Sequence, residues 1–163
     1  MLTFEQMYRS HFPDVFRFAV WLTRDRSEAE DVASETFVRA WARRDRLRTD
    51  TLKAYLLAIA RNVFLSDRKR PGSHEELPTD LQDGSPDPQR RAASRMELDR
   101  VRSALARLPE TDRAALVLRS ENSLSYAEIA RVLEISEGAA RVKVHRARRR
   151  LLADAITDHG GTP

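Results

Sequence analysis

Mostly apolar residues recur at helical spacing through the first 70 residues of the chain. One stripe with the i, i+3, i+4 spacing of a helix face consists of Ala29, Val32, Ala33, Thr36, Phe37, Ala40 and Trp41. A second stripe with the same spacing consists of Leu52, Tyr55, Leu56, Ile59, Ala60, Val63 and Phe64. It is followed by three basic residues typical of a helix C-terminus, Arg68, Lys69 and Arg70. The pattern predicts two amphipathic helices, the second over residues 52–70.

Capping patterns indicate where the helices of this first block begin. Thr3 and Gln6 place a hydroxyl and, three residues later, an amide, which can each accept from a backbone N–H of the first turn. We expect the helix that starts there to run to about residue 23. Ser27 and Glu30 repeat the pattern at the start of the helix that carries the first stripe. Three helices of this kind can share a single core.

A second block, 92–156, contains four further stretches with helical spacing. The first is marked by Leu98, Val101, Leu105 and Leu108. Pro109 lies where proline is tolerated, at the first turn of the next helix, 110–120. Ser125 opens another capping box before a short helix. Ser136 is the expected N-cap of a longer last helix, which runs to about residue 153.

The segment between the two blocks interrupts the helical pattern. Four of the seven prolines lie in 71–88, and 71–89 contains five acidic residues and no lysine or arginine. Residues 71–94 are therefore predicted to be a flexible, acidic linker. The fold class is predicted to be all-α, with two small helical domains, 1–70 and 95–156, on either side of this linker.

Composition narrows the classes of function. The chain of 163 residues has no cysteine, so it offers no disulfide framework or cysteine nucleophile, and its four histidines are scattered. We expect no metal site, catalytic site or cofactor. No stretch approaches the roughly 20 apolar residues of a membrane span, and the N-terminus lacks the pattern of a secretory signal. We therefore expect a cytoplasmic protein without membrane insertion.

The last helix carries the candidate binding chemistry. It follows a short capped helix and a tight connection, which is the layout of a helix-turn-helix. Its core-facing positions are Ala140, Val144, Ala147 and Leu151, and its other faces carry Arg141, Val142, His145, Arg146 and Arg149. Arginine suits the O6 and N7 acceptors of guanine, so these residues are candidates for reading DNA. A basic amphipathic helix can equally be a solvated face, or an element that touches RNA or acidic protein.

Two independent sets of motifs resemble one family. Residues 105–152, with Leu108-Pro109, Tyr126-Ala127-Glu128-Ile129-Ala130 and His145-Arg146-Ala147-Arg148 at matching spacing, resemble region 4 of extracytoplasmic-function sigma factors. Residues 27–41 resemble region 2.2 of the same family, and residues 52–70 resemble regions 2.3 and 2.4. The resemblance implies a promoter-recognition subunit of RNA polymerase that has no catalytic site of its own.

The resemblance also implies roles for residues of the first block. In the family, region 2.2 docks on the clamp helices of the polymerase's largest subunit, and here an acidic stripe is available for that contact, formed by Glu28, Asp31 and Glu35. The region 2.3/2.4 helix opens the minus-ten element and holds a flipped base. Asn62 matches the family's asparagine, and the path for the DNA backbone is then supplied by Arg61, Arg68, Lys69 and Arg70.

The remaining implied partners concern the linker and the second block. In the family, the acidic linker enters the polymerase channel through which nascent RNA will pass. The second block is expected to bind the minus-thirty-five element through the last helix and to contact the flap of the second polymerase subunit. Core RNA polymerase, promoter DNA and an anti-sigma factor are therefore the expected partners.

Two alternatives remain open at this point. The chain could be a helix-turn-helix regulator that binds DNA without polymerase, or a sigma-like protein that sequesters a regulator. Only a sigma factor needs the acidic stripe together with Asn62. Two positions depart from the family pattern, because Tyr55 stands where tryptophan is usual and Ser123 stands where glycine is usual. We expect Asn122 to adopt the left-handed conformation of that turn.

Overall fold

The computed structural model describes residues 1–68 and 88–159, and every regular element in these residues is helical. This confirms the prediction of an all-α fold. The elements in chain order are α1 (Phe4–Thr23), α2 (Arg26–Ala42), the 3-10 turn η1 (Arg44–Arg46), α3 (Leu52–Arg68), α4 (Pro88–Ala106), α5 (Glu110–Ser120), α6 (Tyr126–Leu133) and α7 (Glu137–His159). No helix in these residues combines the length and the apolar character that crossing a membrane requires.

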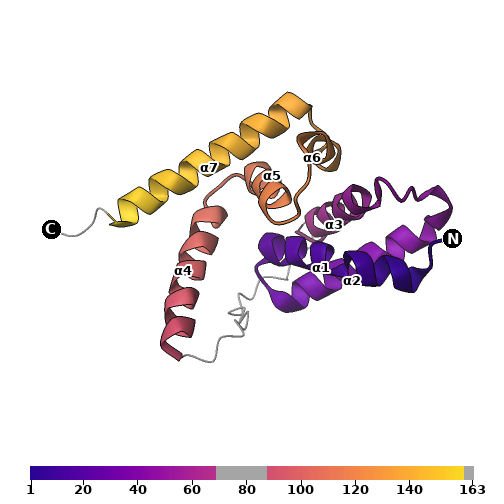
Figure 1. Ribbon diagram of the computed structural model, residues 1–163, viewed down its shortest axis with the longest axis horizontal. Coiled ribbons are helices and arrows are strands. Elements are labelled where there is room, and N and C mark those ends of the chain that lie inside the picture. The colour runs from indigo at the N-terminus through magenta and orange to yellow at the C-terminus, as the bar shows by residue number, and fades with distance from the viewer. Residues whose placement is uncertain (69–87, 160–163) are drawn as a thin grey trace.

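Helices α1, α2 and α3 pack against one another as a three-helix bundle (Figure 1). Both sequence stripes point into its core, where the largest fully buried side chains include Met7, Phe18, Leu22, Phe37, Leu56 and Phe64. Thr36, the one polar member of the first stripe, is also buried, and its hydroxyl donates to the Val32 carbonyl at 2.7 Å. That hydrogen bond removes the cost of burying an unpaired hydroxyl.

The starts of the first two helices differ in how well the sequence predicted them. The capping box of Thr3 and Gln6 is present at α1, as predicted. The predicted box of Ser27 and Glu30 is wrong, because α2 already begins at Arg26. Its N-cap is Asp25, whose carboxylate accepts the Glu28 N–H at 3.0 Å. The carboxylate next to the positive end of the helix dipole favours this earlier start.

Helices α5, α6 and α7 form the second bundle, with the buried side chains of Leu118, Ile129, Val144 and Ala147 among its core. The capping box of Ser125 and Glu128 is present, and the Ser136 hydroxyl accepts the Ala139 N–H at 3.0 Å, so both predicted N-caps are confirmed. Helix α7 continues beyond the predicted end near residue 153, to His159.

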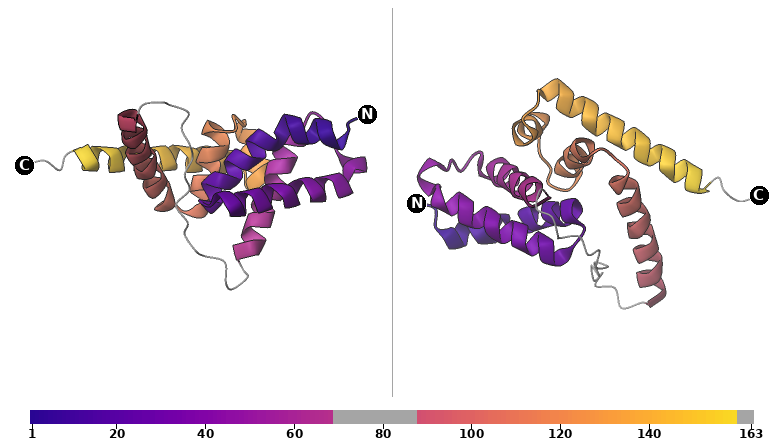
Figure 2. Two further views of the ribbon diagram at one scale, coloured as in Figure 1. Left: turned by 90° about the horizontal axis from the view of Figure 1, so that it is seen from below. Right: turned by 180° about the vertical axis from the view of Figure 1, so that it is seen from behind.

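Helix α4 starts earlier than its hydrophobic stripe predicted. Residues 88–94, which were expected in the linker, form its first turns and are exposed along their whole length. Its last turns pack against α7, while its N-terminal end extends away from the rest of the molecule (Figures 1 and 2). The predicted linker residues before Pro88, and Lys69 and Arg70, lie outside the described residues.

The two bundles are in contact with each other, α3 against α6 and α1 against α5. Arg61 of α3 donates two hydrogen bonds to the Glu110 carboxylate at the start of α5, at 3.2 and 3.0 Å. The side chain of Asn122 is fully buried and donates to the Asp14 carbonyl of α1 at 3.0 Å. These bonds orient the second bundle on the first.

The turn between α5 and α6 corrects one expectation. Ser123, not Asn122, adopts the left-handed conformation, with a φ of 56°. The side chain of Asn122 instead donates a hydrogen bond to Asp14 of the first bundle. It is therefore not available for the local hydrogen bonds that would stabilise a left-handed conformation within the turn. Ser123 is exposed, so the hydroxyl can remain hydrated while the backbone takes the strained conformation.

Candidate nucleic-acid interface

Helices α6 and α7 form the predicted helix-turn-helix with a short connection between them. Leu133 is the last residue of α6, and Glu134 ends the helix in the left-handed conformation, with a φ of 57°. Ser136 then caps α7, so the chain turns within residues 134–136. The caps at both ends of this turn fix the direction in which α7 leaves α6.

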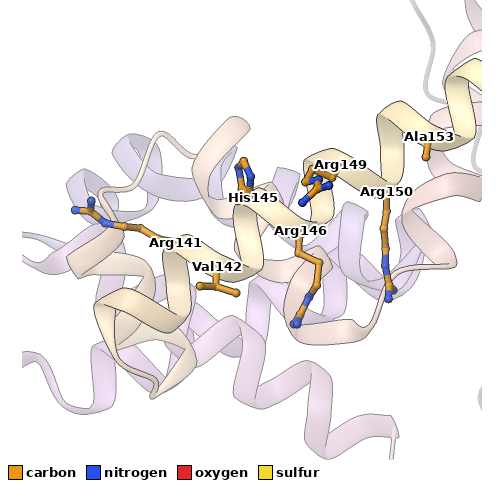
Figure 3. Close-up of a pocket in the computed structure, with 7 residues that line it drawn as sticks. All are labelled: Arg141, Val142, His145, Arg146, Arg149, Arg150 and Ala153. Atoms are coloured by element: carbon orange, nitrogen blue, oxygen red, sulfur yellow. The ribbon is translucent and has the colours of Figure 1, made fainter.

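The outer face of α7 is a basic surface with one apolar member. Arg141, His145 and Arg149 are exposed, and Val142 between them has 58% of its surface exposed. They line a shallow groove together with Arg146, Arg150 and Ala153 (Figure 3). A face that combines guanidinium donors with an apolar side chain can contact both guanine acceptors and a thymine methyl group in a major groove.

Arg146 differs from Arg141 because its guanidinium is paired with a fully buried carboxylate of another helix. It donates to both carboxylate oxygens of Asp112 in α5, at 2.8 and 2.9 Å. Asp112 has no exposed surface, and its second cation is Lys143 at 3.6 Å. Arg146 therefore fixes α7 on α5, while part of its side chain stays exposed on the groove.

The same pairing sets the protonation of Asp112. The hydrogen bonds from Arg146 lower the pKa of this carboxyl below its ordinary value of 3.8, and the charges of Arg146 and Lys143 act in the same direction. Burial opposes them, because it penalises the charged form. The carboxylate is therefore ionised at neutral pH, as the Arg146 pair requires.

An aromatic ring supports Arg141, and this contact was not predicted from the sequence. The guanidinium carbon of Arg141 lies 5.0 Å from the centroid of the Tyr126 ring. Arg119 of α5 lies 4.4 Å from the same centroid. Tyr126, like Asp112, could not be identified in advance, because both act through contacts between helices that no spacing rule encodes.

The predicted minus-ten residues of α3 have separate environments. Asn62 is exposed, as a base-binding residue would have to be. Arg61, its neighbour, points to the second bundle, where its pair with Glu110 leaves 11% of the arginine side chain exposed. Arg68 is the last residue of α3, and its side chain, with Lys69 and Arg70, lies outside the described part of the chain.

The acidic stripe of α2 is on the surface of the first bundle, away from α7. Asp31 and Glu35 are exposed and Glu28 is half-buried. Glu35 accepts from Arg39 one turn further along the helix at 2.7 Å, so its charge is partly compensated. Asp31 is the stripe's most available carboxylate, and among the described residues it has no ion-pair partner.

Comparison with known sequence families gives two matches in this order along the chain. Residues 7–73 match the family described as "Sigma-70 region 2". Residues 98–151 match the family described as "Sigma-70, region 4". The first match contains α2 and α3 with the acidic stripe and Asn62, and the second contains the helix-turn-helix.

Individual proteins are similar over almost the whole chain. The "ECF RNA polymerase sigma factor SigM" of Bacillus subtilis is 32% identical, over 93% of this chain and 94% of that protein. The "ECF RNA polymerase sigma factor SigE" of Mycolicibacterium smegmatis is 34% identical over 98% of this chain, which spans 63% of the length of SigE. The sigma factor RpoE of Bartonella quintana, solved in complex with the anti-sigma factor NepR, superimposes with a TM-score of 0.71 and 26% identity, over 95% of this chain and 98% of RpoE.

Proposed function

This chain belongs to the extracytoplasmic-function sigma factors, and we propose that its two bundles bind core RNA polymerase and divide the reading of promoter DNA between them. Sigma factors of this family are promoter-recognition subunits of RNA polymerase. A regulator that acts without polymerase does not explain why region 2 accompanies region 4. A sequestering protein has no need of the acidic stripe together with Asn62. Each bundle then acts at its own step of transcription initiation.

Helix α7 reads the upstream, minus-thirty-five element as duplex. The observation that carries this assignment is the exposed face of Arg141, Val142, His145 and Arg149 on the second helix of a helix-turn-helix. A helix of this kind fits the major groove, where arginine recognises guanine and an apolar side chain recognises thymine. Arg146 contributes to the same interface, and its pair with Asp112 positions the helix.

Helix α3 acts on the minus-ten element after the strands separate. Asn62 is exposed and can hydrogen-bond the edge of a flipped base, and Arg61 can pair with the backbone next to it. Arg61 is occupied by Glu110 while the bundles are packed together. Promoter opening therefore requires the second bundle to move off α3.

Helix α2 supplies the contact with core polymerase. Its exposed carboxylates Asp31 and Glu35 suit a basic surface such as the clamp helices, and they lie on a different element from either DNA-reading helix. The flap of the second subunit is the corresponding contact of the second bundle. The polymerase carries out the chemistry, and this chain acts in the cytoplasm, without enzymatic activity of its own.

An anti-sigma factor is the remaining partner. The similar protein RpoE was solved in complex with one. The two bundles of this chain are packed face to face, so a partner that stabilises the packed arrangement would keep Arg61 from DNA.

Run-off transcription with core polymerase and genomic promoter fragments tests the proposal. We expect specific transcripts only when the protein is added. Arg149→Ala should weaken binding to upstream duplex by about 1–3 kcal/mol, the usual value of one base contact, while Arg90→Ala on α4 removes an equal charge without effect. Absence of any start site selected by the protein would refute the function.

The division of labour is tested on duplex and pre-melted templates. Asn62→Ala should reduce permanganate reactivity of thymines around the start site on the duplex and weaken binding of the holoenzyme to the pre-melted template, because the flipped base loses its partner. Arg149→Ala should act on the duplex alone. Ser66→Ala, an exposed position on the same helix α3, is the matched control. Normal opening by Asn62→Ala would remove this residue from the minus-ten site.

A further inference from the structure

Arg141 combines an exposed position with a fixed one. Its side chain retains 63% of its surface, as a residue that contacts DNA must. An exposed arginine normally samples many rotamers, and ordering it on a ligand costs conformational entropy. Here the guanidinium has two partners before any DNA is bound. It lies 5.0 Å from the centroid of the Tyr126 ring, and its Nη2 is 3.3 Å from Glu137 Oε1.

The two partners constrain Arg141 differently. Glu137 lies one turn earlier on the same helix, and its side chain is itself 53% exposed, so the ion pair is screened and weak. Tyr126 is the first residue of α6 and packs on the hydrophobic core. A ring face attracts a guanidinium, and the planar groups can stack. The ring therefore provides the fixed surface, and Glu137 adds only a local contact.

The Tyr126 ring is itself held by its neighbours. Ser125 and Glu128 form the capping box that fixes the start of α6, so the backbone of Tyr126 is ordered. Arg119 of α5 lies over the same ring at 4.4 Å, and it donates to the Leu124 carbonyl at 2.9 Å. A chain of contacts thus runs from α5 through the turn and the ring to the outer face of α7.

We propose that Tyr126 is a positioning residue for Arg141, which it holds in the orientation that reads one base pair of the upstream element. This inference rests on the proposed function, because it takes Arg141 as a base-reading residue. The ring acts through the arginine and not through its own hydroxyl. It determines how strongly one base pair is discriminated, and it contributes little to the attraction between protein and DNA backbone.

Two substitutions separate the ring from the hydroxyl. Tyr126→Phe keeps the ring face and removes the hydroxyl, and Tyr126→Leu removes the ring. The probe is the duplex that the full chain, in complex with core polymerase, selects from a pool of randomised duplexes. Affinities are then measured for this duplex and for its single-base variants over a range of salt concentrations, and Arg141→Ala identifies the base pair that Arg141 reads.

We expect Tyr126→Leu to reduce discrimination at that base pair about two- to fivefold, which corresponds to about 0.5–1 kcal/mol for a cation–π contact at an exposed site. Discrimination at other base pairs and the dependence of affinity on salt should stay as in the parent. Tyr126→Phe should discriminate as the parent does. In the Arg141→Ala background, Tyr126→Leu should have no further effect at that base pair, because the two changes remove the same interaction.

Three results would overturn the inference. Unchanged discrimination by Tyr126→Leu would mean that the ring does not position Arg141. Equal weakening on all sequences, with a salt dependence reduced by about one phosphate contact, would make Tyr126 a backbone-binding residue. If the parent chain selects no sequence from the pool, the proposed function itself fails, and the inference fails with it. Unaltered discrimination at the other base pairs shows that Tyr126→Leu still folds.

Discussion

Arg146 has the position of a DNA-reading residue and the contacts of a structural one. Its guanidinium uses two of its five N–H donors on Asp112, which is fully buried. Removal of Arg146 would leave that carboxylate with Lys143 alone, at 3.6 Å. A loss of DNA binding in Arg146→Ala therefore combines a lost contact with a displaced helix. Arg149, which is exposed, reports on DNA contact more directly.

The Asp112 pair predicts how stability depends on pH. Because the pKa of Asp112 is lowered in the folded protein, the pair stabilises the fold above the unfolded pKa and is lost as pH falls through the lowered value. We expect Asp112→Asn to reduce the free energy of unfolding by about 1–3 kcal/mol at pH 7. As the pH falls through the ordinary value of 3.8 and below it, the variant should lose less stability than the parent.

Urea denaturation at several pH values measures this difference. Glu97→Gln, at an exposed position on α4, is the matched loss of one charge and should follow the parent curve. If the free energy of unfolding of Asp112→Asn and of the parent changed with pH in the same way, the ionised Asp112 carboxylate would not be stabilised by Arg146.

At the scale of the element, α2 carries a buried apolar stripe on one face and the acidic stripe on another. Asp31→Lys should weaken binding to core polymerase several-fold at low salt, because it reverses an exposed charge that has no ion-pair partner among the described residues. Ser34→Lys adds one positive charge at another exposed position of the same helix. Because Asp31→Lys changes the charge by two units, an effect of overall charge alone would be about half as large in free energy for Ser34→Lys. A pull-down or titration with core enzyme measures the effect, which should shrink as salt increases.

The helicity of both variants should equal that of the parent, since neither residue packs in the core. A free-energy effect of Ser34→Lys about half as large as that of Asp31→Lys would show that α2 attracts the polymerase only through overall charge. Unchanged binding by Asp31→Lys would show that the acidic stripe is a solvated face.

Individual elements show what a sequence can and cannot predict. The stripes of α2 and α3 identified buried residues because helical periodicity alone decides which face is apolar. The predicted start of α2 was wrong because Asp25 and Ser27 are both good N-cap residues, and the local sequence does not show which of them caps the helix. Tyr126 and Asp112 were missed because their partners lie on other helices. Asn122 was misassigned for the same reason, since Asp14 is far away in the sequence.

At the scale of the whole molecule, one ion pair joins α3, the proposed DNA-opening helix, to the second bundle. Arg61 and Glu110 are largely buried, with 11% and 22% of their side chains exposed, so their bidentate pair is little screened by solvent. Glu110→Gln should loosen the packing of the bundles, because it leaves the Arg61 charge without its counter-charge. We expect a larger radius of gyration in small-angle scattering and tighter binding to single-stranded DNA.

The radius of gyration and the affinity for single-stranded DNA, measured together with helicity, distinguish separation of the bundles from unfolding. Helicity should be retained, because the contact lies between bundles and outside either core. Glu97→Gln again serves as the control of equal charge. A variant that stays as compact as the parent would show that the remaining contacts, among them the bond of Asn122 to the Asp14 carbonyl, hold the bundles together.

The occupied Arg61 side chain also has a consequence for the order of events in time. One guanidinium cannot hold the Glu110 carboxylate and a DNA phosphate in the same fork. In the role proposed for Arg61, release of Glu110 must therefore come before capture of the DNA strand. When release is slow, the observed rate of capture stops rising with strand concentration and levels off at the rate constant of release. The rate constant for breaking the ion pair then sets the maximum rate of capture. It is a property of the protein and does not depend on the promoter sequence.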